Sequence, residues 1–227
     1  MEEKYEKIKK IVEKEVQGLP PSHDFSHIMR VYNLCITIAK HENNVDLEVL
    51  KIAALLHDIA RKEEDLNSSG KVDHAILGAE RAEKILRRLG FDKSKISNIK
   101  HCIVSHRYRG TNKPETIEAK ILFDADKLDS IGAIGVARSF CWQGENKAQI
   151  YSKVPLKKYI KENLAGAKSN GKIKDKSKHS ANIEFETKLR HIPEKLYTEK
   201  AKEIAKERMR FMEEFFERLK KETEGKA

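Results

Sequence analysis

The stretch AALLHDIARKEE, residues 53–64, ends an apolar helical run with a histidine and an aspartate side by side. Burying two titratable, hydrogen-bonding side chains at the end of a core helix costs free energy unless each side chain finds a partner. What pairs with His57 and Asp58 therefore bears on both the fold and the function of this chain.

Helical periodicity continues on both sides of that stretch. Apolar residues recur at intervals of three and four, and stop signals such as Gly18 and Gly90 separate the runs. The predicted helices cover residues 5–16, 25–42, 46–60, 73–89, 94–106 and 114–132. Because no segment alternates apolar and polar residues between turn signals, the sequence predicts an all-α fold.

The helical pattern loosens beyond Gly144. The segment GAKSNGKIKDKSKHS, residues 166–180, is rich in Lys, Gly and Ser and short of apolar residues, so it is predicted to be a mobile loop. Such a loop is either a lid over a phosphate site or a solvated connection. A final helical region carries an apolar stripe from Ala201 to Leu219, which is predicted to pack onto the rest of the domain. We expect a helical core of residues 1–143 and a loop and helical extension of residues 144–227, in a single domain.

The composition is that of a globular protein with a heavily charged surface. Hydrophobic residues make up 39% of the 227 residues and charged residues 36%, which excludes a disordered chain. Lys and Arg outnumber Asp and Glu by 46 to 36, giving a net charge of +10 that favours phosphate-bearing partners. The lysine excess is taken to be dispersed and lacks interleaved aromatic residues, which argues against a nucleic-acid partner.

Three cysteines lie far apart and form no CxxC pair, which argues against a disulfide framework and against a cysteine zinc site. The N-terminal stretch MEEKYEKIKK lacks the apolar centre of a signal peptide, and no apolar run approaches the roughly 20 residues of a membrane span. We therefore expect a cytoplasmic protein with no membrane partner. The sequence leaves its oligomeric state open.

Three of the predicted helices each carry imidazole or carboxylate groups in an apolar setting. His27 lies within HDFSHIMRV, His57 and Asp58 end the next helix, and Asp126 lies within FDADKLD. Taken singly, His27 could be a hydrogen-bonded helix residue and Asp126 an ordinary ion-pair member. Taken together, two imidazoles and two carboxylates form a mixed nitrogen and oxygen shell suited to a divalent metal. A metal would also give His57 and Asp58 their partner.

The order H…HD…D resembles that of the HD-domain superfamily of metal-dependent phosphohydrolases. SHDFSHIMRVYNLCITIAK resembles the first-helix motif of that family, ALLHDIA its doublet helix and ILFDADKLDSIGAIGVAR its last metal-binding helix. ANIEFETKL and AKEIAKERMRFMEEFFERL resemble the C-terminal part of a subgroup of small soluble bacterial and archaeal HD hydrolases. The resemblance extends from about residue 20 to residue 222.

This resemblance implies an HD-domain helical bundle with a C-terminal helical extension. It implies that His27, His57, Asp58 and Asp126 hold one divalent ion, which could be Mn, Mg, Co, Ni, Fe or Zn. The implied reaction is hydrolysis of a phosphoester or phosphoanhydride by metal-activated water, on a small phosphorylated substrate that we expect to be a nucleotide. The alternative is a non-catalytic HD protein that senses a nucleotide at the same site.

Two further histidines resemble positions that bind a second ion in some HD families. They are His74 in VDHAILGAE and His106 in IVSHRYRG. Since His74 lies near a predicted helix start and His106 near a helix end, each could instead satisfy only backbone groups or the helix dipole. The sequence leaves one ion or two open.

The general base is not obvious from the sequence. Some HD nucleotidases carry a glutamate three positions after the aspartate of the doublet, where this chain has Arg61. The role would then pass to Asp58 or Asp129, unless metal-bound hydroxide suffices. Asp129 follows Asp126 by three residues and shares its helix face, but it could equally be a helix cap or an ion-pair member.

Cationic residues near the expected ligands are candidates for contacts with substrate phosphate, although each alone could be a surface charge. Arg30 follows His27 by three residues and Arg61 follows Asp58 by three, so each shares a helix face with a ligand. The full candidate set is Arg30, Arg61, Lys62, Arg107, Arg109 and Lys127.

Overall fold

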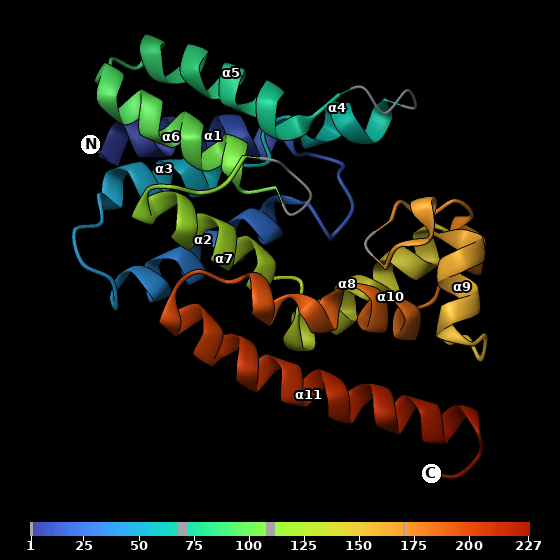
Figure 1. The fold of residues 1–227 in the computed structure, drawn as a ribbon. Coiled ribbons are helices and arrows are strands. Elements are labelled where there is room, and N and C mark those ends of the chain that lie inside the picture. Colours follow the sequence, from blue (N-terminus) through green and yellow to red (C-terminus); the bar gives the residue numbers. More distant parts are fainter. Residues whose placement is uncertain (1, 68–71, 108–111, 170) are drawn as a thin grey trace. The chain divides into compact units, whose positions relative to one another are not determined.

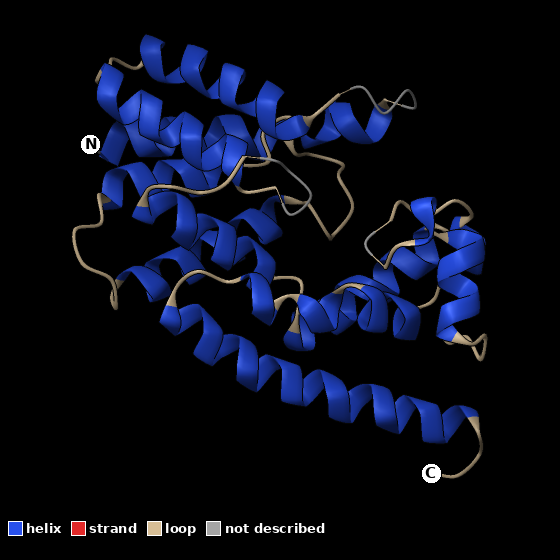
Figure 2. Cartoon of the chain, viewed as in Figure 1, coloured by secondary structure: helices blue, strands red, loops and turns tan. Residues whose placement is uncertain are grey.

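The structure is a computed structural model that describes residues 2–67, 72–107, 112–169 and 171–227. Within these residues the regular elements are all helical (Figure 2), and β-type pairing is limited to two isolated bridges. The predicted all-α fold class is confirmed. None of the described helices has both the length and the apolar character needed to cross a bilayer.

The chain divides into two compact units, Met1–Lys127 with Leu196–Ala201, and Leu128–Lys195 with Lys202–Ala227. The boundary between these units lies at Lys127 and not at residue 143, where the sequence predicted the helical core to end. That division stays a prediction, because compactness does not show which part of the chain folds independently.

The first unit is built around one central helix. Its helices are α1 (Glu2–Glu15), α2 (Phe25–Ala39), α3 (Leu47–Leu56), α4 (Arg61–Leu66), α5 (His74–Arg88), α6 (Lys93–Ser105) and α7 (Ile117–Leu128), the last residue of which belongs to the second unit. Helix α3 packs against α1, α2 and α6 and is apolar nearly all round, as a core helix must be. Helices α5 and α6 lie side by side as an antiparallel pair (Figure 1).

Aspartate caps set where several of these helices begin. The side chain of Asp46 accepts hydrogen bonds from the backbone N–H groups of Glu48 and Val49, and that of Asp73 from those of Ala75 and Ile76. Such a cap stabilises a helix by about 1 kcal/mol. The predicted helix starts near residues 46 and 73 are confirmed.

Several predicted helix boundaries are wrong. The helices expected to end at residues 42 and 132 end at Ala39 and Leu128, and two further differences have a visible cause. The helix expected over residues 46–60 ends at Leu56, since His57 turns back and its Nδ1 lies 2.8 Å from the carbonyl oxygen of Ala54, satisfying a group exposed at the helix end. The helix expected from Pro114 starts at Ile117, where the Thr116 hydroxyl accepts a hydrogen bond from the N–H of Ala119.

The second unit contains shorter helices and one long one. They are α8 (Gly132–Glu145), α9 (Leu156–Asn163), α10 (Ala181–Thr187) and α11 (Glu199–Thr223), whose first residues belong to the first unit. Helix α8 is separate from α7 because the chain turns at Gly132, where φ is 77° and a Cβ would lie 2.8 Å from the Cγ of Arg208. The apolar stripe predicted for the last helix is buried at Met209, Met212 and Phe216, as expected for packing.

The loop of residues 166–180 is folded back on its own ends, with residue 170 outside the described part. The N–H of Ala165 donates to the carbonyl of Lys172, and the N–H of Lys174 to that of Asn163, each at 2.9 Å. Ile173 packs against an apolar cluster of the same unit. The expectation that packing cannot hold this loop is therefore wrong, while its role as a lid stays a prediction.

Candidate metal centre

Six imidazole and carboxylate side chains of the first unit meet at one place. Five of them are buried and Asp126 is partly buried. They are His27 in α2, His57 and Asp58 at the end of α3, His74 at the start of α5, His106 at the end of α6, and Asp126 in α7. The structure thus brings together the four predicted ligands of one ion and the two histidines considered for a second.

The two carboxylate oxygens of Asp58 have different neighbours. Oδ2 lies 3.7 Å from Nε2 of His27 and 3.7 Å from Nε2 of His57. Oδ1 lies 3.3 Å from Nε2 of His74 and 3.5 Å from Nε2 of His106. Each oxygen therefore faces its own pair of imidazoles, and Asp58 is the one residue shared by both groups.

Asp126 joins the first of these groups. Its Oδ1 lies 3.6 Å from Nε2 of His27, and its Oδ2 lies 2.5 Å from the ammonium of Lys127. His27, His57, Asp58 and Asp126 therefore offer two imidazole nitrogens and two carboxylates around a common centre. His74 and His106 offer two more nitrogens on the other side of Asp58.

Within each group the imidazole nitrogens approach closely. Nε2 of His57 lies 3.3 Å from Nε2 of His27, and Nε2 of His74 lies 3.2 Å from Nε2 of His106. Nδ1 of His57 and of His106 face the carbonyl oxygens of Ala54 and Ile103, so each Nδ1 carries the proton. In a neutral ring the lone pair then lies on Nε2. Two facing lone pairs would repel, so each close approach needs either an N–H hydrogen bond from one ring to the other or a metal ion between the rings.

Glu64 is a site residue that sequence reasoning missed. Its Oε2 lies 2.6 Å from Nδ1 of His74 and accepts the backbone N–H of His74 at 2.9 Å, while its Oε1 accepts from Arg107 at 2.9 Å. A carboxylate behind a metal-ligating histidine fixes its tautomer and orientation. In the sequence Glu64 is one acidic residue in the run KEED, which has the composition of a solvated helix face.

Comparison with known proteins identifies the family. The HD-domain family model matches residues 24–131. The protein YpgQ of Bacillus subtilis, itself uncharacterised, is 31% identical over 207 residues, which cover 89% of this chain and 85% of YpgQ. This chain belongs to the HD-domain superfamily. His57-Asp58 lies within the matched residues, and its assignment as the HD doublet stays a prediction.

Solved structures of HD proteins agree with that assignment. The crystal structure of a predicted HD superfamily hydrolase from an uncultured Thermotogales bacterium has a TM-score of 0.64 and 32% identity, and the match covers 96% of this chain and 91% of that one. Bacillus subtilis YpgQ in complex with ADP has a TM-score of 0.71 and 26% identity, and the match covers 97% of this chain and 95% of YpgQ. The likeness to these two proteins therefore extends over nearly the whole chain, beyond the residues that the HD-domain family model matches.

We call the six side chains His27, His57, Asp58, His74, His106 and Asp126 the HD cluster. Its protonation follows from its burial and its charges. Burial raises the pKa of Asp58. The neighbouring His57, His106 and His74 lower that pKa by more than burial raises it, so it lies well below its usual range. Burial also raises the pKa of Asp126, and the charges of Lys127 and His27 outweigh that effect and lower it. Both carboxylates are thus ionised at neutral pH, as metal ligands must be.

Two histidines of the HD cluster have pKa values shifted in opposite directions. Burial lowers the pKa of His57, so this ring is neutral and its Nε2 can bind a metal. Burial also lowers the pKa of His74, but hydrogen bonds to Asp58 and Glu64 more than compensate and raise it to about 9. In the metal-free protein His74 therefore holds a proton that a metal would have to displace.

Arg107 stands beside a third group of potential ligands, made of Glu64, Asp73 and His74. It lies 2.9 Å from Oε1 of Glu64 and 2.6 Å from Oδ2 of Asp73. Its guanidinium forms ion pairs with both carboxylates. This third group therefore orients the HD cluster instead of offering a further cation site.

The predicted cationic residues have partners of their own. Arg61 pairs with Asp65 at 2.9 Å, and burial lowers its pKa less than the charges of Asp58 and Asp65 raise it. Arg30 donates to the hydroxyl of Ser26 at 2.9 Å. Lys62 donates to the carbonyl of Gln17 at 3.1 Å, whereas Arg109 lies outside the described residues.

Asp129, a candidate base, belongs to the second unit. Its carboxylate is buried, and Nη1 of Arg138 lies 2.6 Å from its Oδ2. Of the two alternatives open from the sequence, the ion pair is the one that the structure shows.

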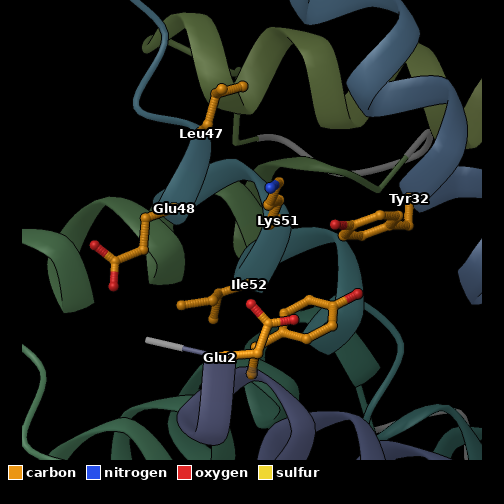
Figure 3. Close-up of a pocket in the computed structure, with 7 residues that line it drawn as sticks. Glu2, Tyr32, Leu47, Glu48, Lys51 and Ile52 are labelled. Carbon is orange, nitrogen blue, oxygen red and sulfur yellow. The ribbon is translucent and has the colours of Figure 1, made fainter.

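A pocket of about 230 Å³ lies elsewhere in the first unit, among α1, α2 and α3. It is lined by Glu2, Tyr5, Tyr32, Leu47, Glu48, Lys51 and Ile52, none of which belongs to the HD cluster. Figure 3 shows the hydroxyl of Tyr32 pointing toward Lys51. The pocket is therefore separate from the ligand-type residues described above.

Proposed function

We propose that this HD protein is a divalent-metal-dependent phosphohydrolase in which Asp58 would contribute a ligand to each of two ion sites. The observation that carries the proposal is that each oxygen of Asp58 faces a separate pair of buried imidazoles. His27, His57, Asp126 and Oδ2 of Asp58 would hold one ion. His74, His106 and Oδ1 of Asp58 would hold the other.

The donor set fits a divalent transition ion. Four imidazole nitrogens with two carboxylates suit Mn, Fe, Co, Ni or Zn better than Mg, which prefers oxygen ligands. The close Nε2 pairs leave each pair of nitrogens aimed at one point, and the ionised carboxylates would balance the charge of an ion bound there. These features support a metal centre without fixing the identity of the metal.

The residues of the chain divide the work of hydrolysis. A divalent ion held in such a site lowers the pKa of water and polarises a phosphoryl oxygen. Glu64 holds the ring of His74 in place through Nδ1. Two cationic side chains would supply positive charge for a substrate phosphate. They are Arg61, whose pKa the charge of Asp58 raises, and Lys127, which pairs with Asp126. With water as the nucleophile, no covalent intermediate on the protein is required.

The substrate that we infer is a nucleotide, cleaved at a phosphoester or a phosphoanhydride. Two features support this inference. The related YpgQ binds ADP in its crystal structure, and the net charge of +10 favours phosphorylated ligands. The second candidate is a sensor that binds a nucleotide at the same centre without turnover, and the same crystal complex favours it.

A metal reconstitution assay tests the proposal. Chelator-treated protein is supplied separately with Mn, Mg, Co, Ni, Fe and Zn and offered a panel of nucleotides, and phosphate and pyrophosphate are measured separately. We expect release that requires metal and that rises with pH through the neutral range as bound water ionises. Nucleotide binding without release by any metal-loaded form would favour the sensor. Full activity in chelator with no metal present would refute both.

A further inference from the structure

The positive charge of the chain is concentrated in one segment of the second unit. Residues 147–178 contain ten lysines and two acidic residues, a formal charge of +8 out of +10 for the whole protein. All other residues together carry only +2. The expectation of a dispersed lysine excess is therefore wrong. We call residues 147–178 the basic segment.

The lysines of the basic segment are displayed to solvent with few counter-charges. All ten are exposed. Among the ion pairs of the described residues, the pair of Lys178 with Asp175 at 3.2 Å is the one that joins a lysine of this segment to a carboxylate. Helix α11 is different, since its eight cationic residues stand among seven acidic ones. The basic segment is thus an unneutralised surface and not a salt-bridged one.

A folded scaffold holds these charges in place. Helix α9 buries Tyr159 and Asn163, and the apolar side of the segment packs within the unit. Asn163 accepts the N–H of Asp175 at 3.0 Å and donates to the Tyr159 hydroxyl and to the Asp175 carbonyl, each at 2.9 Å. Lys157, Lys158 and Lys161 are exposed on the same helix. The charges therefore sit on a fixed frame and not on a tail.

We propose that the basic segment binds the phosphodiester backbone of duplex nucleic acid, an activity separate from the metal centre. Lysine ammonium groups act as point charges for phosphates, and exposed lysines with few counter-charges release counterions from a polyanion on binding. Single strands are held by bases stacked on exposed rings. In this segment Tyr159 is buried and Tyr151 is half-buried, which favours a duplex contacted through its backbone.

An anionic membrane surface fits the segment less well. A helix that lies on a bilayer inserts its apolar face. The apolar side of α9 is already used, because Tyr159 is packed against Leu164 and Ile183, with Ile160 beside them. The large hydrophobic side chains that the segment does expose are aliphatic, those of Ile150 and Val154.

Fluorescence anisotropy with the full chain tests the proposal. The probes are labelled DNA and RNA duplexes of about 20 base pairs and a single-stranded oligouridine, at about 50 to 200 mM salt. If five lysines contact phosphates, the logarithm of the DNA binding constant falls with the logarithm of salt concentration with a slope of about −4.5. Duplexes should bind more tightly than oligouridine.

A matched pair of variants locates the surface. The test variant carries Lys157→Gln, Lys158→Gln, Lys161→Gln and Lys172→Gln. The control carries Lys10→Gln, Lys14→Gln, Lys84→Gln and Lys93→Gln, four exposed lysines of the first unit, and so loses the same net charge. We expect duplex binding to weaken about tenfold or more in the test variant only, with a shallower salt slope. Circular dichroism checks that both variants are folded.

Three outcomes would overturn the proposal. One is the absence of duplex binding at the lowest salt concentration. Another is an equal loss of binding in the test and control variants, which would mean that only net charge matters. The third is tighter binding to vesicles containing phosphatidylserine than to either duplex, which would assign the surface to a membrane.

Discussion

The carboxylate of Asp58 has one oxygen within 3.7 Å of His27 and His57 and the other within 3.5 Å of His74 and His106. These are the partners that an aspartate at the end of an apolar helix requires. In the metal-free state the protonated His74 supplies one of them. In the metal-bound state that we propose, the ions replace this proton.

At the residue scale, Glu64→Gln should weaken binding of the second ion. The variant keeps the shape of the side chain but loses the charge that orients His74 through Nδ1. Loss of such an orienting carboxylate typically costs about 10- to 100-fold in metal affinity. Isothermal titration with the metal that reconstitutes activity measures the change. Glu80→Gln, at an exposed position of α5, is the control and should bind as the parent does.

The raised pKa of His74 gives a pH dependence to the metal-free protein. A folded-state pKa of about 9, against 6.5 unfolded, contributes stability that is fully present below pH 6.5 and is lost as the pH rises through 9. Glu64→Gln removes one cause of that rise. The difference in unfolding free energy between parent and variant should therefore shrink between about pH 6 and about pH 9.5, by no more than about 3 kcal/mol.

Urea denaturation of both proteins at the two pH values measures this difference. A gap that stays constant or widens with rising pH would show that His74 is not held protonated by Glu64. The same comparison with Glu80→Gln should show no pH-dependent gap.

At the element scale, the sequence predicted the helices that carry clear start signals. Asp46 and Asp73 are N-cap residues that mark a helix start in the sequence itself. The long apolar stripes of α2 and α11 have the period of a helix and not of a strand. Helix ends were less predictable, because Leu56 is followed by residues that could continue a helix. The chain stops there because the His57 side chain turns back to the Ala54 carbonyl, a contact that no periodicity reveals.

The candidate site was predictable to a similar extent. His27, His57, Asp58 and Asp126 share an order that resembles a family pattern, and His74 and His106 follow the same resemblance. Glu64 and Arg107 were not assigned this way, because their partners are set by tertiary contacts between α4, the start of α5 and the end of α6. Exposed acidic runs such as KEED look alike whether or not one member turns inward.

The polar network around α9 yields a testable prediction at this scale. The Tyr159 hydroxyl lies 2.7 Å from Nδ1 of His179 and accepts from Asn163, and Nε2 of His179 lies 2.9 Å from Glu184. Tyr159→Phe leaves two buried groups without that partner and should cost about 1–3 kcal/mol of unfolding free energy. Tyr151→Phe, with its less buried ring, is the control. Equal unfolding free energies for the two variants in urea would show that the network adds no stability.

At the scale of the whole molecule, the ligand-type cluster lies in one compact unit and the basic segment in the other. Ions that bind the folded but not the unfolded chain stabilise it by about 2.7 kcal/mol at a free concentration 100 times Kd. Metal removal should therefore speed hydrogen exchange mainly in the first unit, at the end of α3 and the start of α5. Exchange in α9 should be unchanged.

Mass-spectrometric hydrogen exchange with and without chelator measures both effects in one sample. Duplex binding in the presence of chelator serves as the matching test of independence, because the basic segment contributes no ligand-type residue to the cluster. Faster exchange in α9 on metal removal would contradict this separation.

The central claim is that Asp58 joins two metal positions, and counting ions tests it most directly. Metal content per chain is measured by plasma mass spectrometry after reconstitution and desalting, for the parent, His74→Gln and Asp58→Ala, with circular dichroism to confirm folding. The account predicts about two ions in the parent, about one in His74→Gln and none retained in Asp58→Ala. A folded Asp58→Ala variant that retains two ions, or a parent that never exceeds one, would contradict it.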